Sequence, residues 1–183
     1  MTFYTTVKLI EELKLDMHQT QMIVSENAFS LKGTTANLLT DDYVSLMDLL
    51  YAMMLPSGND AAQTIAENLG KLYEEITEMR KNTKTLAVAK FANAQKKSPM
   101  NDCLFIKFMN KHAGELGLYN TVFSNSHGMC CTKNYSTCED ISALCEIALT
   151  FPLFREIIKT KLWNGNVKRN NSVKVLNWEN TNK

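Results

Sequence analysis

The sequence predicts one mainly α-helical domain with a small antiparallel β-component. Most apolar residues recur at helical spacing, and residues that typically begin or end helices stand at the ends of these runs. Residues that favour β-structure gather mainly near the C-terminal end, around an Asn-Gly-Asn sequence. A chain of 183 residues with 45% hydrophobic residues is long enough to enclose a single core, so residues 1–183 are expected to form one domain.

The N-terminal part begins with an amphipathic helix, predicted over Thr2–Leu15, and a short strand, predicted over Met22–Val24. Ser45 followed three residues later by Asp48 predicts the start of a second helix, since the serine hydroxyl can accept a backbone N–H there. Pro56 cannot continue that helix. A turn is therefore expected directly after it.

The middle of the chain is predicted to hold two longer helices. The first runs from Asp60 to about Lys81 and tolerates Gly70. The second covers Cys103–Leu116, and Gly117 is placed to end it, because glycine readily adopts the left-handed conformation of a C-terminal cap.

The C-terminal part is predicted to contain two more helices and a hairpin. Ser136 and Glu139 have the spacing of a capping box, and Phe151-Pro152 begins the last helix. In the stretch Lys161–Leu176, the sequence Asn164-Gly165-Asn166 is the predicted turn of a β-hairpin.

The stretch Pro56–Ala62 places a serine and an asparagine two positions apart on the turn between two helices. A serine hydroxyl both donates and accepts hydrogen bonds, and an asparagine amide can orient a peptide, so Ser57 and Asn59 together suit a substrate site. Capping of the following helix by Asn59 or Asp60 is the structural alternative. Ser-x-Asn is one of three motifs of the penicillin-binding enzymes, and the others, Ser-x-x-Lys and Lys-Thr-Gly, do not occur here.

Further motifs follow in a fixed order along the chain: Met109-Asn110, Leu116-Gly117, Thr121-Val122-Phe123, Asn125-Ser126-His127-Gly128-Met129, Ser136-Thr137 with Asp140, and Asn180-Thr181-Asn182-Lys183. With Ser-x-Asn they resemble the D-alanyl-D-alanine carboxypeptidases, the low-molecular-mass penicillin-binding serine peptidases. Ser126 stands where that family usually has proline. In the family, His127 would hold a loop by hydrogen bonds.

The resemblance implies the helical subdomain of a β-lactamase-like transpeptidase fold, an α+β parent fold, with an incomplete antiparallel sheet. Met1-Thr2 matches the residues that follow the family's Ser-x-x-Lys, and Lys183 lies before its Lys-Thr-Gly strand. A partial catalytic domain, truncated at both ends, is therefore expected over residues 1–183. Residues 73–102, which contain a basic cluster, are interpreted as an insertion.

By the same resemblance, the enzyme would cleave the terminal D-Ala-D-Ala bond through an acyl-enzyme. Ser57 would pass a proton toward the leaving amine, and Asn59 would hydrogen-bond the substrate amide. Both roles are supporting ones, so this chain alone is expected to be inactive. Its expected partner is a peptide ending in D-Ala-D-Ala, if the missing motifs are restored.

Two stretches have the spacing of the missing motifs. Thr5-Thr6-Val7-Lys8 lies inside an amphipathic run and is interpreted as a helix face, and Lys159-Thr160-Lys161 is interpreted as a solvated helix end. Two other functions stay open: a non-catalytic binding or structural protein derived from the fold, and an unrelated helical interaction module.

Composition and sequence pattern narrow the remaining classes of function. A net charge of +1 gives no electrostatic case for nucleic acid. No apolar run reaches the ~18 residues of a membrane span, and no signal-peptide pattern opens the chain, although the resembled family is extracytoplasmic. No cofactor is expected. Buried or half-buried thiols are expected for the five cysteines, Cys103, Cys130, Cys131, Cys138 and Cys145. A zinc site formed by some of them with His127 is disfavoured. His18 and His112 are expected at the surface.

Overall fold

A computed structural model describes residues 1–82 and 102–181. Its elements, in chain order, are α1 (Thr2–Leu13), β1 (Gln21–Ile23), α2 (Glu26–Phe29), β2 (Tyr43–Ser45), α3 (Leu46–Met54), α4 (Asn59–Asn82), α5 (Asp102–Glu115), α6 (Cys138–Thr150), α7 (Pro152–Lys159), β3 (Leu162–Arg169) and β4 (Ser172–Glu179). The predicted fold class, mainly α with a small antiparallel sheet, is confirmed. Most of the interpreted insertion at 73–102 lies outside the described residues, so that interpretation stays a prediction.

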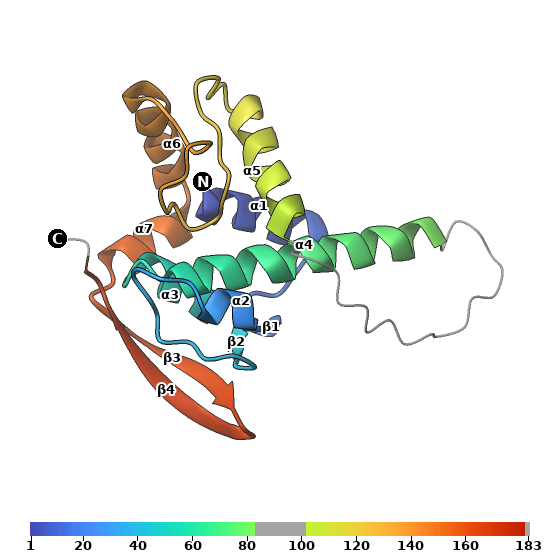
Figure 1. The fold of residues 1–183 in the computed structure, drawn as a ribbon, viewed down its shortest axis with the longest axis vertical. Helices are drawn as coiled ribbons and strands as arrows, with labels where there is room; N and C mark the ends of the chain where they lie inside the picture. The colour runs from blue at the N-terminus through green and yellow to red at the C-terminus, as the bar shows by residue number, and fades with distance from the viewer. Residues whose placement is uncertain (83–101, 182–183) are drawn as a thin grey trace.

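The long helix α4 runs through the middle of the molecule (Figure 1). Helices α1, α5 and α6 lie on one side of it, and the four-stranded sheet lies on the other. The strands are antiparallel in the order β1-β2-β3-β4. Val44, Val167 and Trp178 point from this sheet toward the helices and are buried, so the sheet has one face in the core.

Helix α3 is apolar on nearly every side because it lies between α4, α7 and the sheet. Eight of its nine residues are buried, and its first turn is capped by Ser45, whose side chain accepts from the Asp48 backbone N–H, as predicted. Tyr51 stacks on Trp163 with ring centroids 3.7 Å apart. The end of α3 is therefore held rigidly where the Ser-x-Asn turn begins.

Two local predictions for the C-terminal part need correction. Helix α6 is capped by Thr137, whose hydroxyl accepts from the Asp140 N–H, while Ser136 contacts the Thr121 hydroxyl at 2.7 Å. The capping box was therefore placed one residue too early. The two hydroxyls are chemically alike, and the tertiary contact with Thr121 decides which of them caps the helix.

The predicted hairpin exists, but its turn lies at Asn170-Asn171, where both residues have positive φ (48° and 59°). The Asn164-Gly165-Asn166 sequence is instead in the middle of β3. A Cβ on Gly165 would lie 2.0 Å from Trp178 Cζ3, so this glycine makes room for an indole ring and does not form the turn. Two adjacent asparagines can adopt the same left-handed conformations as Asn-Gly.

Burial differs from expectation at two kinds of side chain. His112 lies at the α1–α5 contact with only 8% of its surface exposed, its Nδ1 is 3.2 Å from Thr5 Oγ1, and burial lowers the pKa of the imidazole. By contrast, the thiols of Cys130, Cys131, Cys138 and Cys145 are exposed, because they lie on the loop before α6 and on accessible positions of α6 itself. Among the described residues, no helix is long and apolar enough to cross a membrane.

Candidate functional site

The Ser-x-Asn turn joins α3 to α4 with almost no intervening chain. Helix α3 ends at Met54, Leu55 forms its C-cap, and α4 begins at Asn59. Ser57 adopts a left-handed backbone conformation with φ of 57°, which is unfavourable for a residue with a side chain. An uncommon backbone conformation that the surrounding structure maintains is a frequent feature of functional sites.

Gly58 is required at this turn because neighbouring atoms approach it closely. Its φ is not in the left-handed region, so it does not supply an unusual backbone conformation. A Cβ at this position would lie 2.7 Å from the Ala52 carbonyl oxygen and 2.8 Å from Asp60 Oδ1. The glycine therefore allows two backbone segments to pack closely beneath Ser57.

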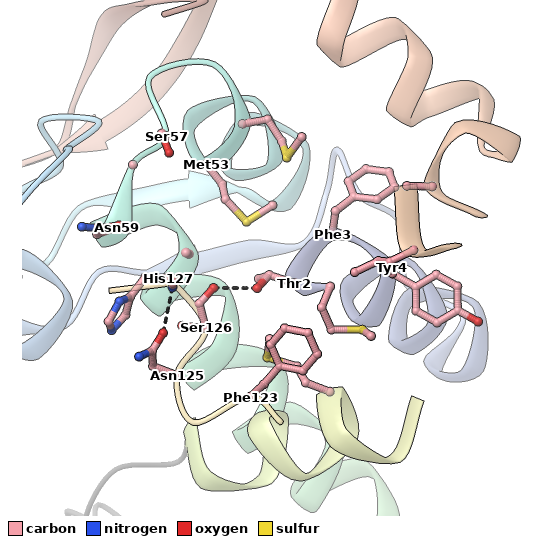
Figure 2. Close-up of a pocket in the computed structure, with 18 of the residues that line it drawn as sticks. Thr2, Phe3, Tyr4, Met53, Ser57, Asn59, Phe123, Asn125, Ser126 and His127 are labelled. Carbon is pink, nitrogen blue, oxygen red and sulfur yellow. Dashed lines mark hydrogen bonds between the residues drawn. The ribbon is translucent and has the colours of Figure 1, made fainter. Parts of the chain in front are cut away.

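Ser57 and Asn59 line one cavity of about 340 Å³. The first turn of α1 and the loop 125–128 form further walls (Figure 2). Apolar side chains from several elements complete it, chiefly Phe3, Met53, Phe123 and Phe154. Among its described lining residues there is no lysine, arginine, aspartate or glutamate, and the hydrogen-bonding groups of residues such as Ser57, Asn59 and His127 lie against an apolar wall.

The orientation of the Asn59 amide follows from its hydrogen bond. Asn59 Nδ2 donates to the Lys32 carbonyl oxygen at 2.9 Å. Because a carbonyl oxygen can only accept, this contact assigns Nδ2 to the Lys32 side and leaves Oδ1 as the acceptor of the amide. The Asn59 side chain does not cap α4. In the first turn of α4, Asp60 Oδ1 instead accepts a hydrogen bond from the Ala61 N–H at 2.9 Å.

The loop 125–128 is fixed against both neighbouring walls. Thr2 Oγ1 donates to the Ser126 carbonyl oxygen at 2.6 Å, and Ser126 Oγ donates to Gln63 Oε1 at 3.1 Å. Within the loop, Asn125 Oδ1 accepts from the Gly128 N–H at 2.7 Å, and His127 Nδ1 accepts from the Met129 N–H at 3.3 Å. His127 thus has the loop-holding contact that the sequence suggested. Ser126, which stands where the family usually has proline, links the loop to α4 through its hydrogen bond to Gln63.

The alternative nucleophile stretch is not part of this cavity. Thr5 is fully buried against His112, and Lys8 forms an ion pair with Glu11 at 2.9 Å. Lys159 and Thr160 form the end of α7, as expected. In the part of the chain that the structure describes, no group of three or more His, Cys, Asp or Glu side chains is arranged to hold a metal ion.

A model of the D-alanyl-D-alanine carboxypeptidase family matches residues 1–96 and 82–183, which together span the chain. The chain belongs to this family. A D-alanyl-D-alanine carboxypeptidase from Streptomyces sp. (strain K15) is 32% identical over 173 residues, covering 93% of this chain and 52% of the relative. D-alanyl-D-alanine carboxypeptidase DacF from Bacillus subtilis (strain 168) is 25% identical over 180 residues, covering 92% of this chain and 39% of the relative.

Solved structures agree with the family assignment. The crystal structure of the Streptomyces K15 DD-transpeptidase superimposes with a TM-score of 0.73 at 26% identity, covering 99% of this chain and 63% of that one. The D-alanyl-D-alanine carboxypeptidase DacD from Francisella tularensis, at 24% identity and a TM-score of 0.65 over 89% of this chain and 33% of that one, shares the fold. The chain spans about half or less of the length of the curated family members it matches.

One element of this candidate site was not predicted from the sequence. Residues 32–38 contact the Ser-x-Asn turn directly, although no motif or periodicity marks them. Gly33, with φ of 98°, is the residue that could have drawn attention to this segment.

Proposed function

We propose that this chain forms one wall of the substrate site of a serine-type D-Ala-D-Ala carboxypeptidase, which hydrolyses the terminal D-Ala-D-Ala peptide bond through an acyl-enzyme. The supporting observation is that Ser57 and Asn59 share one cavity with the first turn of α1 and the loop 125–128. Family membership supplies the reaction class, and the cavity supplies a place where a short peptide can lie.

The two motif residues have distinct roles in this proposal. The Asn59 amide hydrogen-bonds a backbone amide of the peptide, since the bond to Lys32 uses only one of its two N–H donors and leaves Oδ1 as an acceptor. Ser57 can receive a proton and donate one in the same step, so it relays a proton toward the leaving amine. Both groups assist a reaction that another group must start.

The sequence contains neither the Ser-x-x-Lys motif, which carries the family's nucleophile and its lysine, nor the Lys-Thr-Gly motif. Among the described residues that line the cavity, there is no lysine beside Ser57. We therefore expect the chain to bind the peptide without cleaving it. This same feature favours the second candidate function, a non-catalytic binding or structural protein that uses the same cavity.

A tripeptide ending in D-Ala-D-Ala is expected to bind the isolated chain weakly at this cavity. Removing one hydrogen-bonding partner should weaken binding by roughly two- to tenfold, so Ser57→Ala and Asn59→Ala should each raise the dissociation constant by that factor. The measurement is a titration of 15N-labelled protein followed by NMR.

Two exposed residues provide matched control variants, Ser142→Ala on α6 and Asn164→Ala on β3, and both should bind like the unmodified chain. The same peptide ending in L-Ala-L-Ala is the ligand control. Equal affinity for both peptides, or no effect of Ser57→Ala and Asn59→Ala, would remove the assigned substrate class.

A further inference from the structure

The segment Lys32–Leu38 connects α2 to β2 and lies along the Ser-x-Asn turn. Three hydrogen bonds join the two. The Asn59 backbone N–H donates to the Thr34 carbonyl oxygen at 2.9 Å, Asn59 Nδ2 donates to the Lys32 carbonyl oxygen at 2.9 Å, and Thr34 Oγ1 donates to the Ser57 carbonyl oxygen. Both residues of the motif are therefore held by this one segment.

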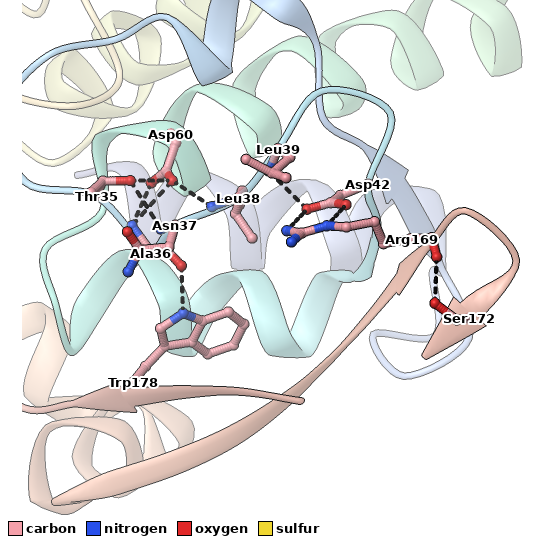
Figure 3. A network of polar contacts seen from close by, with 10 residues as sticks. All are labelled: Thr35, Ala36, Asn37, Leu38, Leu39, Asp42, Asp60, Arg169, Ser172 and Trp178. Carbon is pink, nitrogen blue, oxygen red and sulfur yellow. Dashed lines mark hydrogen bonds and ion pairs between the residues drawn. The ribbon is translucent and has the colours of Figure 1, made fainter. Parts of the chain in front are cut away.

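Asp60 anchors the same segment to the start of α4 (Figure 3). Its side chain is buried, with 2% of the residue exposed. The carboxylate accepts from Thr35 Oγ1 at 2.7 Å, from the Ala36 N–H at 2.9 Å and from the Leu38 N–H at 3.1 Å. A buried carboxylate with several donors fixes the positions of all of them, because any displacement leaves a charge without partners.

The opposite side of the segment is held by the β3–β4 hairpin. Trp178 Nε1 donates to the Ala36 carbonyl oxygen at 2.9 Å. Beyond the segment, Arg169 pairs with the buried Asp42 carboxylate through two contacts of 2.6 and 2.7 Å (Figure 3). The segment thus lies between the hairpin and α4 and is hydrogen-bonded to both.

Two local features show that the contact with the turn is close. The left-handed conformation of Ser57 is unfavourable in isolation, and Thr34 Oγ1 bonds to the carbonyl group of that same residue. At Gly33 a Cβ would lie 2.7 Å from Asn59 Nδ2. Only glycine leaves room for the Asn59 amide to reach Lys32 in its present orientation.

We propose that Lys32–Leu38 is a positioning segment, which sets the Ser57 backbone and the Asn59 amide in the orientation that presents this amide to a peptide in the cavity. Gly33 and Thr34 are its positioning residues, and Asp60 is its anchor. The ligand assignment rests on the function proposed above, whereas the orientation of Asn59 is a property of the free chain.

The variant Gly33→Ala tests the proposal, with Gly117→Ala as its matched control. Both glycines have positive φ (98° and 77°), so both variants carry backbone strain, but a Cβ at Gly117 would lie no closer than 4.0 Å to a neighbouring side chain. NMR of the 15N-labelled chain is expected to show displaced signals of the Asn59 side-chain amide and the Ser57 N–H in Gly33→Ala alone. Unchanged Asn59 signals in Gly33→Ala would overturn the proposal.

A second pair of variants separates positioning from stability. Thr34→Val removes the hydroxyl donor to Ser57, whereas Thr34→Ser keeps it. The valine variant should displace the Ser57 and Asn59 signals and weaken binding of the D-Ala-D-Ala tripeptide by about tenfold at most, and the serine variant should restore both. Equal effects of valine and serine would show that the hydroxyl does not position the turn.

The affinity for the tripeptide and the NMR signals of Asn59 together distinguish this proposal from the proposed function. If the unmodified chain binds no D-Ala-D-Ala tripeptide while Gly33→Ala still displaces the Asn59 signals, the segment positions the motif and only the assigned ligand is wrong. If the tripeptide binds and Gly33→Ala binds it with unchanged affinity, the positioning role is refuted and the assigned ligand stands.

Discussion

The 183-residue chain is expected to form no covalent adduct with penicillin. β-Lactams acylate the nucleophilic serine of the penicillin-binding enzymes, and no serine in this sequence is followed by lysine three residues later. In serine peptidases, loss of the nucleophile lowers turnover about a million-fold, or ~8 kcal/mol of transition-state stabilisation. The described residues that line the cavity include no lysine, the residue that accompanies the family's nucleophile, so Ser57 is not expected to replace it.

Gel fluorescence after incubation with a labelled penicillin measures this directly, with a complete penicillin-binding serine peptidase as the positive control. Denaturation before electrophoresis removes reversible binding. A labelled band from this chain that persists after denaturation and is absent in Ser57→Ala would make Ser57 the nucleophile, and the supporting role assigned to it would be wrong.

The variant Asp60→Ala is expected to lower the free energy of unfolding by roughly 3 kcal/mol or more, because several buried donors lose their acceptor. The Ala36 and Leu38 N–H groups and the Thr35 hydroxyl all donate to this carboxylate. Urea unfolding followed by circular dichroism measures the loss. Asp60→Asn keeps one acceptor oxygen and should therefore lose less than Asp60→Ala.

Glu146→Ala is the control for this series, since Glu146 is an exposed carboxylate on α6. Its effect should stay within about 0.5 kcal/mol. If Asp60→Ala proved no more destabilising than Glu146→Ala, the carboxylate would not anchor the positioning segment, and the packing of the β3–β4 hairpin would have to hold it alone.

The parts of the fold that could be predicted are those encoded by neighbouring residues. The cap at Ser45 and the break at Pro56 placed α3 and the turn after it to within a residue or two. Gly117 ended α5 because a left-handed cap depends only on its own conformation and on the helix before it. The Ser-x-Asn motif could be recognised for the same reason, because its residues are neighbours in the sequence.

The parts that could not be predicted depend on contacts between distant residues. Asp60 binds backbone groups more than twenty positions earlier, and nothing in the sequence of the positioning segment indicates that partner. The hairpin turn was misplaced because the role of Gly165 is set by Trp178 on the opposite strand. His112 was expected at the surface because its burial depends on how α1 and α5 pack.

A crystal structure of this chain with a bound D-Ala-D-Ala tripeptide would test the substrate assignment most directly. We expect the peptide in the cavity between the Ser-x-Asn turn and the loop 125–128, with its backbone within hydrogen-bonding distance of the Asn59 amide and the nitrogen of the D-Ala-D-Ala bond near Ser57 Oγ. A peptide bound elsewhere, or one that lies in the cavity without contacting Ser57 or Asn59, would contradict the assignment.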